Sequence, residues 1–154
     1  MQENRHLLTD LGIQLSHHEL RPVYQIATEK KRGITRSSSS LHFTDFSTVS
    51  GSDNLAQAIT IRLLTPRGEL TALAHPDYGS RLHELIGQPN TDNTRNLVRL
   101  YILEALQQEV RIAEIIKLKV AQVPGTRDQL SVLLQVLPVA STEVVTVEGI
   151  TLIL

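Results

Sequence analysis

The sequence contains no cysteine and no tryptophan, and its aromatic residues, three tyrosines and two phenylalanines, make up 3% of the chain. Without cysteine there is no disulfide, no thiolate metal ligand and no thiol chemistry. So few rings leave little for stacking against single-stranded nucleic acid bases, and a core must be built from aliphatic side chains. These absences exclude thiol-based redox and thiol chemistry and argue against a nucleic-acid partner.

Long hydrophobic runs and an excess of one charge are also missing. No stretch approaches the roughly 18 apolar residues of a membrane span, and the first residues lack the apolar core of a signal peptide. We therefore expect a protein made in the cytoplasm, with no direct membrane insertion. The formal net charge is −1, from 15 basic and 16 acidic residues. This balance fits protein partners better than DNA.

The N-terminal quarter differs in composition from the rest. Residues 1–20 carry short apolar clusters without a helical period, and residues 27–40 are polar, basic and serine-rich. Lys30-Lys31-Arg32 with Arg36 could contact phosphate or acidic lipid headgroups, but a solvated basic loop is the better explanation of the run. Such a composition buries too little apolar area to offset the entropy of ordering it. We expect an extension, residues 1–44, with a flexible loop, and one compact domain, residues 45–154.

Periodicity and caps predict helices in the first half of this domain. Leu55, Ile59 and Leu63 recur every four residues after the capping residue Ser52, which predicts a helix over 52–64. The Pro-Gly-containing turn 65–68 ends it. A short helix over 80–86, capped by Ser80 and ended by Gly87, and a long helix over 93–108, capped by Thr91 or Asp92, follow. The long helix is apolar on more than one side and should be packed on more than one side.

After Arg111 the apolar period changes from helical to alternating, which is typical of strands. Turn signals at 124–128 and 138–142 separate three such runs. The pattern predicts an α/β (α+β) fold in which a small antiparallel sheet of about three strands packs against two to three helices.

The last strand carries one acidic residue and no lysine or proline between Val144 and Leu154. Free edges of this composition aggregate unless charge, bulges or another segment protects them. One explanation is that another chain completes the sheet by strand addition. The other is an internal strand covered by the N-terminal segment.

A metal site is not predicted. His17-His18 with Glu19 is the densest cluster of candidate ligands, but adjacent side chains diverge and no HExxH motif or second cluster supports them. Nucleotide-binding and nucleophile-elbow motifs do not occur either. We predict no cofactor.

Carboxylate pairs raise the question of glycoside hydrolysis, which needs two carboxyl groups in different environments. The candidate pairs are Asp77 with Glu84 and Glu104 with Glu109. Nothing in the sequence fixes a cleft, and carboxylates on helix surfaces are usually solvated. We therefore predict that the protein is not an enzyme and has no catalytic residues.

Glu109 and Arg111 stand where the long helix gives way to the first strand. Two opposite charges at such a junction can pair with each other, a surface interaction worth about 0–1 kcal/mol. Alternatively, they can reach the charges and backbone of a partner. The sequence leaves both alternatives open.

Several of these motifs occur together in one order: Asp45-Phe46-Ser47, the 52–64 helix, Thr65-Pro66-Arg67-Gly68-Glu69, Asp77-Tyr78-Gly79 and the Glu109/Arg111 junction. In this order and spacing they resemble the GPW-type baseplate wedge family, the sheath-initiating baseplate subunit of contractile phage tails and contractile injection systems. The family typically has Glu-Pro-Arg at the junction, where this chain has Val110 in the middle.

The resemblance implies a structural baseplate component, present in six copies, that links the wedge to the sheath and templates sheath polymerisation by strand addition. It implies that wedge proteins bind the helical side and contact Glu109 and Arg111, and that sheath subunits add strands to the last strand. The residues expected to take part there are Val145, Val147, Ile150 and Leu152. Tube or hub proteins are further candidate partners, for residues 1–44. The expected location is the baseplate of a contractile particle.

Two alternatives come from other classes. An adaptor that binds one soluble partner would need no open sheet edge. Members of the family have also been described as lysozyme-like, and a peptidoglycan hydrolase would need paired carboxylates in a cleft.

Overall fold

The computed structural model describes residues 8–18, 21–34 and 40–154 of the chain. The chain forms two compact units, which divide between Asn54 and Leu55 inside the first helix. The division lies ten residues after the boundary that we expected from composition.

The elements in chain order are β1 (Thr9–Leu11), β2 (Ile13–His18), β3 (Arg21–Ile26), β4 (Thr28–Ile34), β5 (Ser40–Phe46), β6 (Thr48–Ser50), α1 (Gly51–Leu64), η1 (Thr71–Leu73), η2 (Leu82–Leu85), α2 (Asp92–Leu106), β7 (Ile112–Gln122), β8 (Gln129–Pro138) and β9 (Val145–Ile153).

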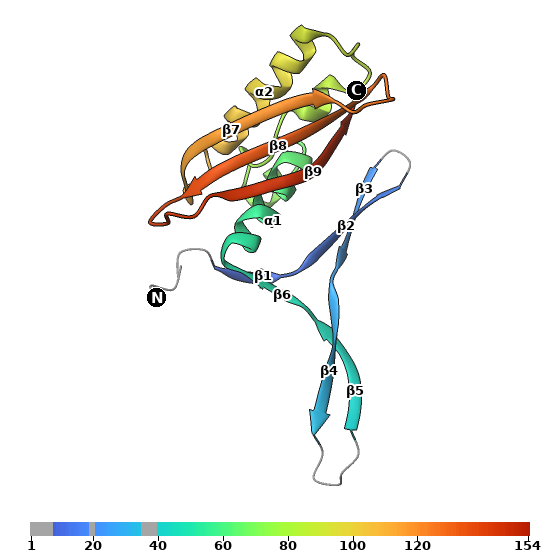
Figure 1. The fold of residues 1–154 in the computed structure, drawn as a ribbon, viewed down its shortest axis with the longest axis vertical. Helices are drawn as coiled ribbons and strands as arrows, with labels where there is room; N and C mark the ends of the chain where they lie inside the picture. Colours follow the sequence, from blue (N-terminus) through green and yellow to red (C-terminus); the bar gives the residue numbers. More distant parts are fainter. Residues whose placement is uncertain (1–7, 19–20, 35–39) are drawn as a thin grey trace. The chain divides into compact units, whose positions relative to one another are not determined.

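The N-terminal unit consists of three two-stranded antiparallel ladders, β1–β6, β2–β3 and β4–β5 (Figure 1). The ladders meet at Gly12, Ala27 and Ser47, the single residues that separate consecutive strands. Their backbone groups form a closed ring of hydrogen bonds: Gly12 N–H donates to Ser47 O (2.8 Å), Ser47 N–H to Ala27 O (2.9 Å) and Ala27 N–H to Gly12 O (2.7 Å). Every backbone N–H and C=O of the three residues is thereby satisfied.

Residues 28–34 form a strand where composition predicted a flexible loop. Strand β4 pairs with β5 over seven consecutive positions, from Thr28↔Phe46 to Ile34↔Ser40. The hydrogen bonds of the ladder join backbone groups and do not depend on the type of side chain. Amino-acid composition therefore does not predict their contribution to stability. Of the serine run, residues 37–39 lie outside the described part.

The C-terminal unit is a three-stranded antiparallel sheet of order β7-β8-β9, the meander that the alternating pattern predicted. Helices α1 and α2 lie on one face of it (Figure 1). On the central strand Leu130, Val132, Leu134 and Val136 are at most 2% exposed. The core therefore lies between these residues and the helices.

The predicted 52–64 helix is confirmed as α1, in which Leu55, Ile59 and Leu63 are at most 1% exposed. In α2 the cap is Thr91, whose hydroxyl accepts a hydrogen bond from Thr94 N–H at 3.2 Å. The expected helix over 80–86 is a single 3₁₀ turn, η2.

Helix α2 buries one side only within the described residues. Val98, Ile102 and Leu106 face the core and are at most 2% exposed. By contrast, Leu97, Leu100 and Leu103 are 41%, 55% and 37% exposed. They follow one another at three-residue spacing, so they form a second apolar stripe, defined here as the outer stripe of α2. In the part of the chain that the structure describes, no helix is long and apolar enough to cross a membrane.

Candidate interaction site at the sheet edges and the helix–strand junction

The segments 65–69 and 77–80 lie side by side. Ser80 N–H donates to Thr65 O and Arg67 N–H donates to Ser80 O, both at 2.8 Å. Gly79 between them has a φ of +103°, and a Cβ at this position would lie 2.5 Å from Thr65 O. Only glycine permits this close backbone approach. The Thr65–Glu69 turn and the Asp77-Tyr78-Gly79 element are therefore two halves of one structural motif.

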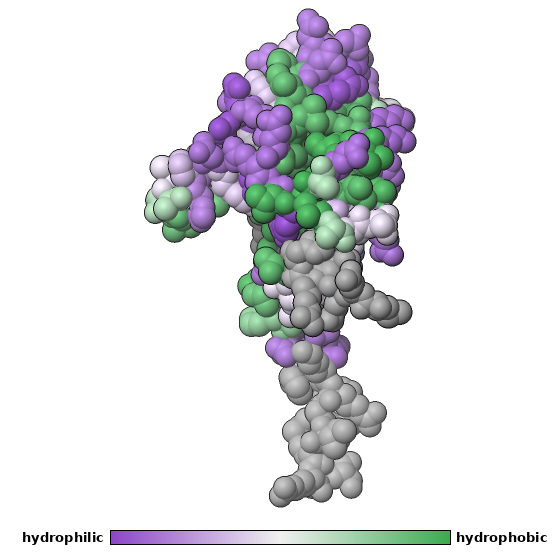
Figure 2. Space-filling view, turned by 90° about the vertical axis from the view of Figure 1, so that its left-hand side faces the viewer, coloured by the Kyte–Doolittle hydropathy of each residue, from purple (hydrophilic) through white to green (hydrophobic). Residues whose placement is uncertain are grey.

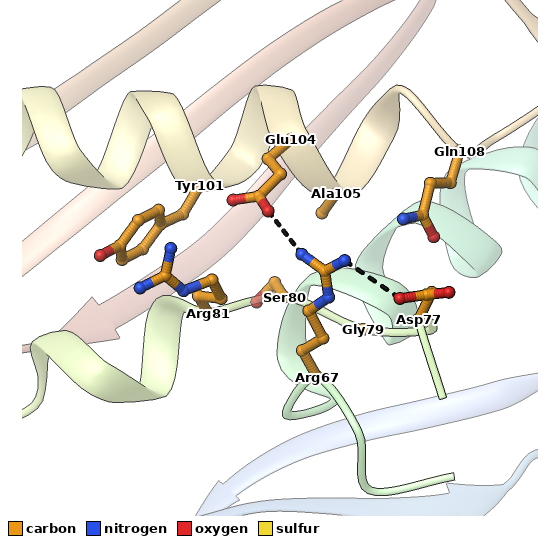
Figure 3. A pocket seen from close by; sticks show the side chains of 9 residues that line it. All are labelled: Arg67, Asp77, Gly79, Ser80, Arg81, Tyr101, Glu104, Ala105 and Gln108. Carbon is orange, nitrogen blue, oxygen red and sulfur yellow. Dashed lines mark hydrogen bonds and ion pairs between the residues drawn. The ribbon is translucent and has the colours of Figure 1, made fainter. Parts of the chain in front are cut away.

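The guanidinium of Arg67 lies in a shallow pocket between two carboxylates (Figure 3). It donates to Asp77 at 3.1 Å and, from its other terminal nitrogen, to Glu104 on α2. Arg81 lies next to it, 4.5 Å above the ring of Tyr101. The pocket encloses no space for a water molecule. Arg67 and its two carboxylate partners thus tie the two segments to α2.

Two of the four candidate carboxylates, Glu84 and Glu109, are held in the charged form. A glycosidic general acid needs a raised pKa, so that it is protonated at neutral pH. The pKa of Glu84 is lowered, chiefly by hydrogen bonds from Arg81, which holds both carboxylate oxygens at 2.8 Å. The pKa of Glu109 is lowered as well. Both shifts favour the charged form, opposite to what proton donation requires.

Glu109 lies in the α2–β7 connection and is 7% exposed. Arg111 Nε donates to Glu109 Oε1 at 2.7 Å, and its Nη2 donates to Oε2 at 3.1 Å. Burial alone would raise the pKa of Glu109, but the hydrogen bonds and charge of Arg111, with the charge of Arg62, more than offset this effect. The two charges of the junction therefore pair with each other in the structure, at side-chain exposures of 18% for Arg111 and 6% for Glu109.

Arg62 completes this cluster and was missed by the sequence analysis. Its Nη2 lies 3.5 Å from Glu109 Oε2, and its guanidinium carbon lies 4.5 Å from the centre of the Tyr78 ring. A signal was present in the sequence, because Arg62 follows Ile59 by three positions and Leu55 by seven. This spacing places it at the margin of the buried stripe of α1, where a charge needs a partner.

The residue between the paired charges is turned outward, since Val110 is 86% exposed. Val139 N–H, after strand β8, donates to Arg111 O at 2.9 Å, which brings the β8–β9 connection to this junction. Val139 is 42% exposed and Val144, before β9, is 47% exposed. Figure 2 views the molecule from this end of the sheet and shows hydrophobic atoms exposed there among hydrophilic ones.

The four residues of β9 that we expected to take part in sheath binding differ in their burial. Val145, Val147 and Ile150 are 5%, 3% and 1% exposed, and Leu152 is partly buried. The side chains of Val145, Val147 and Ile150 belong to the core, so these three residues can meet another chain only through their backbone. Among the described strands, β9 is hydrogen-bonded on one side only, to β8.

Strand β9 contains a bulge that the sequence analysis did not predict. The register passes from Val132↔Ile150 to Leu134↔Val147, so that two residues of β9, Glu148 and Gly149, face one residue of β8. Gly149 has a φ of +80°, which is typical of such bulges. The glycine inside an alternating run was the available signal.

The residues that the structure describes contain no group of three or more His, Asp or Glu side chains that could hold a metal ion. The candidate His17-His18-Glu19 cluster lies outside the described side chains.

The family model for contractile injection system sheath initiators matches residues 28–136, and the chain belongs to this family. No curated protein sequence matches the chain. Its fold is similar to that of a Geobacter sulfurreducens protein whose crystal structure is described as that of a candidate tail lysozyme, with a TM-score of 0.57 and 22% identity. The match covers 66% of this chain and 89% of the other.

The family identifies the protein as a structural component of a contractile injection system, associated with sheath and baseplate. At 22% identity the Geobacter protein establishes a likeness of fold alone.

Proposed function

We propose that this protein is the non-enzymatic baseplate subunit on which the sheath begins to polymerise, and that a sheath subunit adds a strand along the open edge of β9. The observation that carries the proposal is that edge, which has one ladder neighbour among the described strands and a single charged residue, Glu148. The family membership supports the sheath as the partner.

One hydrogen bond identifies which backbone groups of β9 face the open edge and could pair with an incoming strand. Leu154 N–H donates to Asp128 O at 2.9 Å, so the backbone of Leu154 faces β8. In an antiparallel ladder the N–H and C=O of one residue point to the same side, and those of its neighbours point to the other. Ile150 and Leu152 therefore bond to β8, whereas Thr151 and Ile153 direct their N–H and C=O toward the open edge.

The bulge limits where an incoming strand can pair. Bulges protect edges because they break the regular spacing of donors and acceptors. On the N-terminal side of the bulge, Val145 and Val147 pair with β8. Only Thr146, which lies between them, faces the open edge in this part of β9. The uninterrupted stretch 150–153 offers two outward residues. We place the first contact of the sheath strand there.

The wedge would bind elsewhere on the same unit. The outer stripe of α2 and the exposed residue Val110 both present apolar surface without a described partner element. Glu109 and Arg111 then contribute indirectly, because their ion pair fixes the conformation of the turn on which Val110 is exposed. We propose that six copies are arranged around a baseplate, each joined to the wedge on one side and to the sheath on the other.

A substitution at Thr151 tests the strand addition. Proline lacks an N–H, and at an edge position whose N–H faces away from the neighbouring strand it leaves the ladder intact. Thr151→Pro should preserve the thermal stability of the isolated protein to within a few degrees and should abolish extended sheaths on assembled baseplates. Electron micrographs of particles from a strain carrying the variant give the readout.

Thr151→Val is the matched control, because it keeps the N–H and the β-branched shape. Normal sheaths in the Thr151→Pro strain, with the variant present in the baseplates, would refute strand addition at this edge. Loss of sheath in the control as well would assign the effect to the side chain instead.

A further inference from the structure

The two edges of the sheet are not equivalent. Val123 N–H donates to Gln129 O at 2.9 Å, so the backbone of Val123 faces β8. The register of β7 is regular between Lys117 and Gln122. By the same alternation as in β9, the C=O of Val120 points away from β8, toward the open side of β7.

That carbonyl is covered by an arginine from α2, the helix that runs beside β7 (Figure 1). Arg99 Nη2 donates to Val120 O at 3.4 Å, at the long end of hydrogen-bond distances. Its other terminal nitrogen donates to Asn96 Oδ1 at 2.6 Å. One end of the guanidinium is thus held by its own helix while the other lies across the edge of the sheet.

The rest of β7 is also unsuited to pairing. It carries Glu114, Lys117 and Lys119, and its register shifts twice, between Ile112 and Glu114 and between Ile115 and Lys117. Charges, lysine above all, and bulges are the devices by which proteins keep edges unpaired. Strand β9 has one charge and one shift.

We propose that Arg99 keeps the β7 edge closed against the β9 edge of a second copy of this chain. A β9 edge pairing with a β7 edge is a heterologous contact, and each added copy would present a new β9 edge, so that such contacts propagate into open filaments. The inference rests on the proposed function, because a subunit that starts a polymer of another protein must not polymerise itself. Together with the charges and register shifts of β7, Arg99 therefore restricts strand pairing to one side of the sheet.

The test compares the sedimentation of purified full-length variants with that of the wild type over a range of concentrations. Arg99→Met keeps an apolar stem but removes every donor and the charge. We expect it to form species larger than dimers, with a weight-average mass at least threefold that of the wild type at the highest concentration. Arg99→Lys, which keeps a cation, should sediment as the wild type does.

Arg95→Ala is the control for loss of an α2 arginine, because Arg95 pairs with Asp92 at 2.9 Å within the helix. Circular dichroism establishes that each variant is folded. If Arg99→Met is unfolded, Arg99→Gln takes its place. A monomeric Arg99→Met, or association in Arg95→Ala to the same extent, would overturn the proposal.

The double variant Arg99→Met/Thr151→Pro identifies the surface that associates. If β7 pairs with β9, removal of the outward N–H of Thr151 should return the protein to the sedimentation of the wild type. Association that persists in the double variant would overturn the proposed contact. This readout uses the isolated protein and needs no sheath, so it can fail while the sheath experiment succeeds, and the reverse.

Discussion

Arg111 Nε lies 2.7 Å from Glu109 Oε1, and the residue between these two, Val110, is 86% exposed. The two charged side chains turn inward because they satisfy each other and Arg62 there. Their shared direction leaves the intervening side chain to point outward. A buried ion cluster thus fixes the conformation of the turn, and the residue that the turn exposes to solvent is apolar.

The first prediction is that Glu109→Gln destabilises the protein by about 3 kcal/mol at neutral pH, because it leaves Arg62 and Arg111 buried without a counter-charge. Chemical denaturation measures this loss. Glu104→Gln is the control. Glu104 pairs with Arg67 at a side-chain exposure of 37%, and such pairs are worth about 0–1 kcal/mol. Equal losses in the two variants would contradict the distinction between a buried and a surface pair.

The second prediction concerns how the destabilisation caused by Glu109→Gln depends on pH. The folded pKa of Glu109 is lowered from the ordinary value of 4.5, so the stability that its charge contributes is present above that pH and is lost as the pH falls through the folded pKa. The gap in unfolding free energy between the wild type and Glu109→Gln should therefore be largest at neutral pH and shrink below pH 4.5. Denaturation midpoints at a series of pH values measure it. A gap that widens in acid would contradict the lowered pKa.

The third prediction separates a role of Val110 in binding the wedge from a role in folding. Val110→Asp should leave the unfolding free energy unchanged to within about 0.5 kcal/mol, since the side chain is exposed. If the wedge binds here, the charge should reduce incorporation into baseplates, measured as the ratio of this subunit to wedge proteins in purified particles. Val110→Thr, which keeps the shape without a full charge, is the control. Normal incorporation of Val110→Asp would place the wedge contact elsewhere.

The C-terminal unit could be predicted from the sequence because its signals are local. The apolar stripe of α1, the Thr91 cap and the alternation in β8 each depend on residues a few positions apart, and the structure confirms them. The Arg62–Glu109 contact joins positions 47 apart in the chain. The sequence shows a charge at the margin of a stripe, but it does not show which residue neutralises it.

The N-terminal unit shows the opposite case. Its composition predicted a flexible loop, because few of its residues can enter a core, yet strands β4 and β5 form. Their ladder depends on the backbone, and the ring at Gly12, Ala27 and Ser47 joins three places far apart in the chain. No local pattern reports such a ring, although Gly12 inside an apolar cluster was a sign of close backbone approach.

The fourth prediction tests the close approach at Gly79. Alanine at this position must adopt a φ of +103° and place its Cβ 2.5 Å from Thr65 O, so Gly79→Ala should cost more than about 2 kcal/mol. Gly87→Ala is a matched control, with a φ of +84° and no atom within 4 Å of the new Cβ. It should cost about 1 kcal/mol, from the backbone alone. Thermal and chemical denaturation measure both, and equal costs would mean that the 65–69 and 77–80 segments separate easily.

The last prediction concerns the ring of the N-terminal unit. A Cβ at Gly12 would lie 2.6 Å from Ser47 Oγ, whereas its other neighbours lie at 3.4 Å. Gly12→Ala should therefore strain the ring by about 1 kcal/mol, since the hydroxyl must move. Ser47→Ala alone should have little effect, and the double variant should recover the wild-type ring because the colliding atom is gone. Hydrogen exchange of the amides of residues 12, 27 and 47 measures the opening of the ring.

We expect several-fold faster exchange of the three amides in Gly12→Ala than in the wild type or the double variant, with the amide of Leu134 in the central strand of the sheet unchanged as an internal reference. Recovery in the double variant is the decisive result, because a general effect of alanine on the strands would persist without the Ser47 hydroxyl. If all variants exchange alike, the three ladders do not depend on close packing at Gly12. The ring would then be a consequence of the ladders rather than the element that joins them.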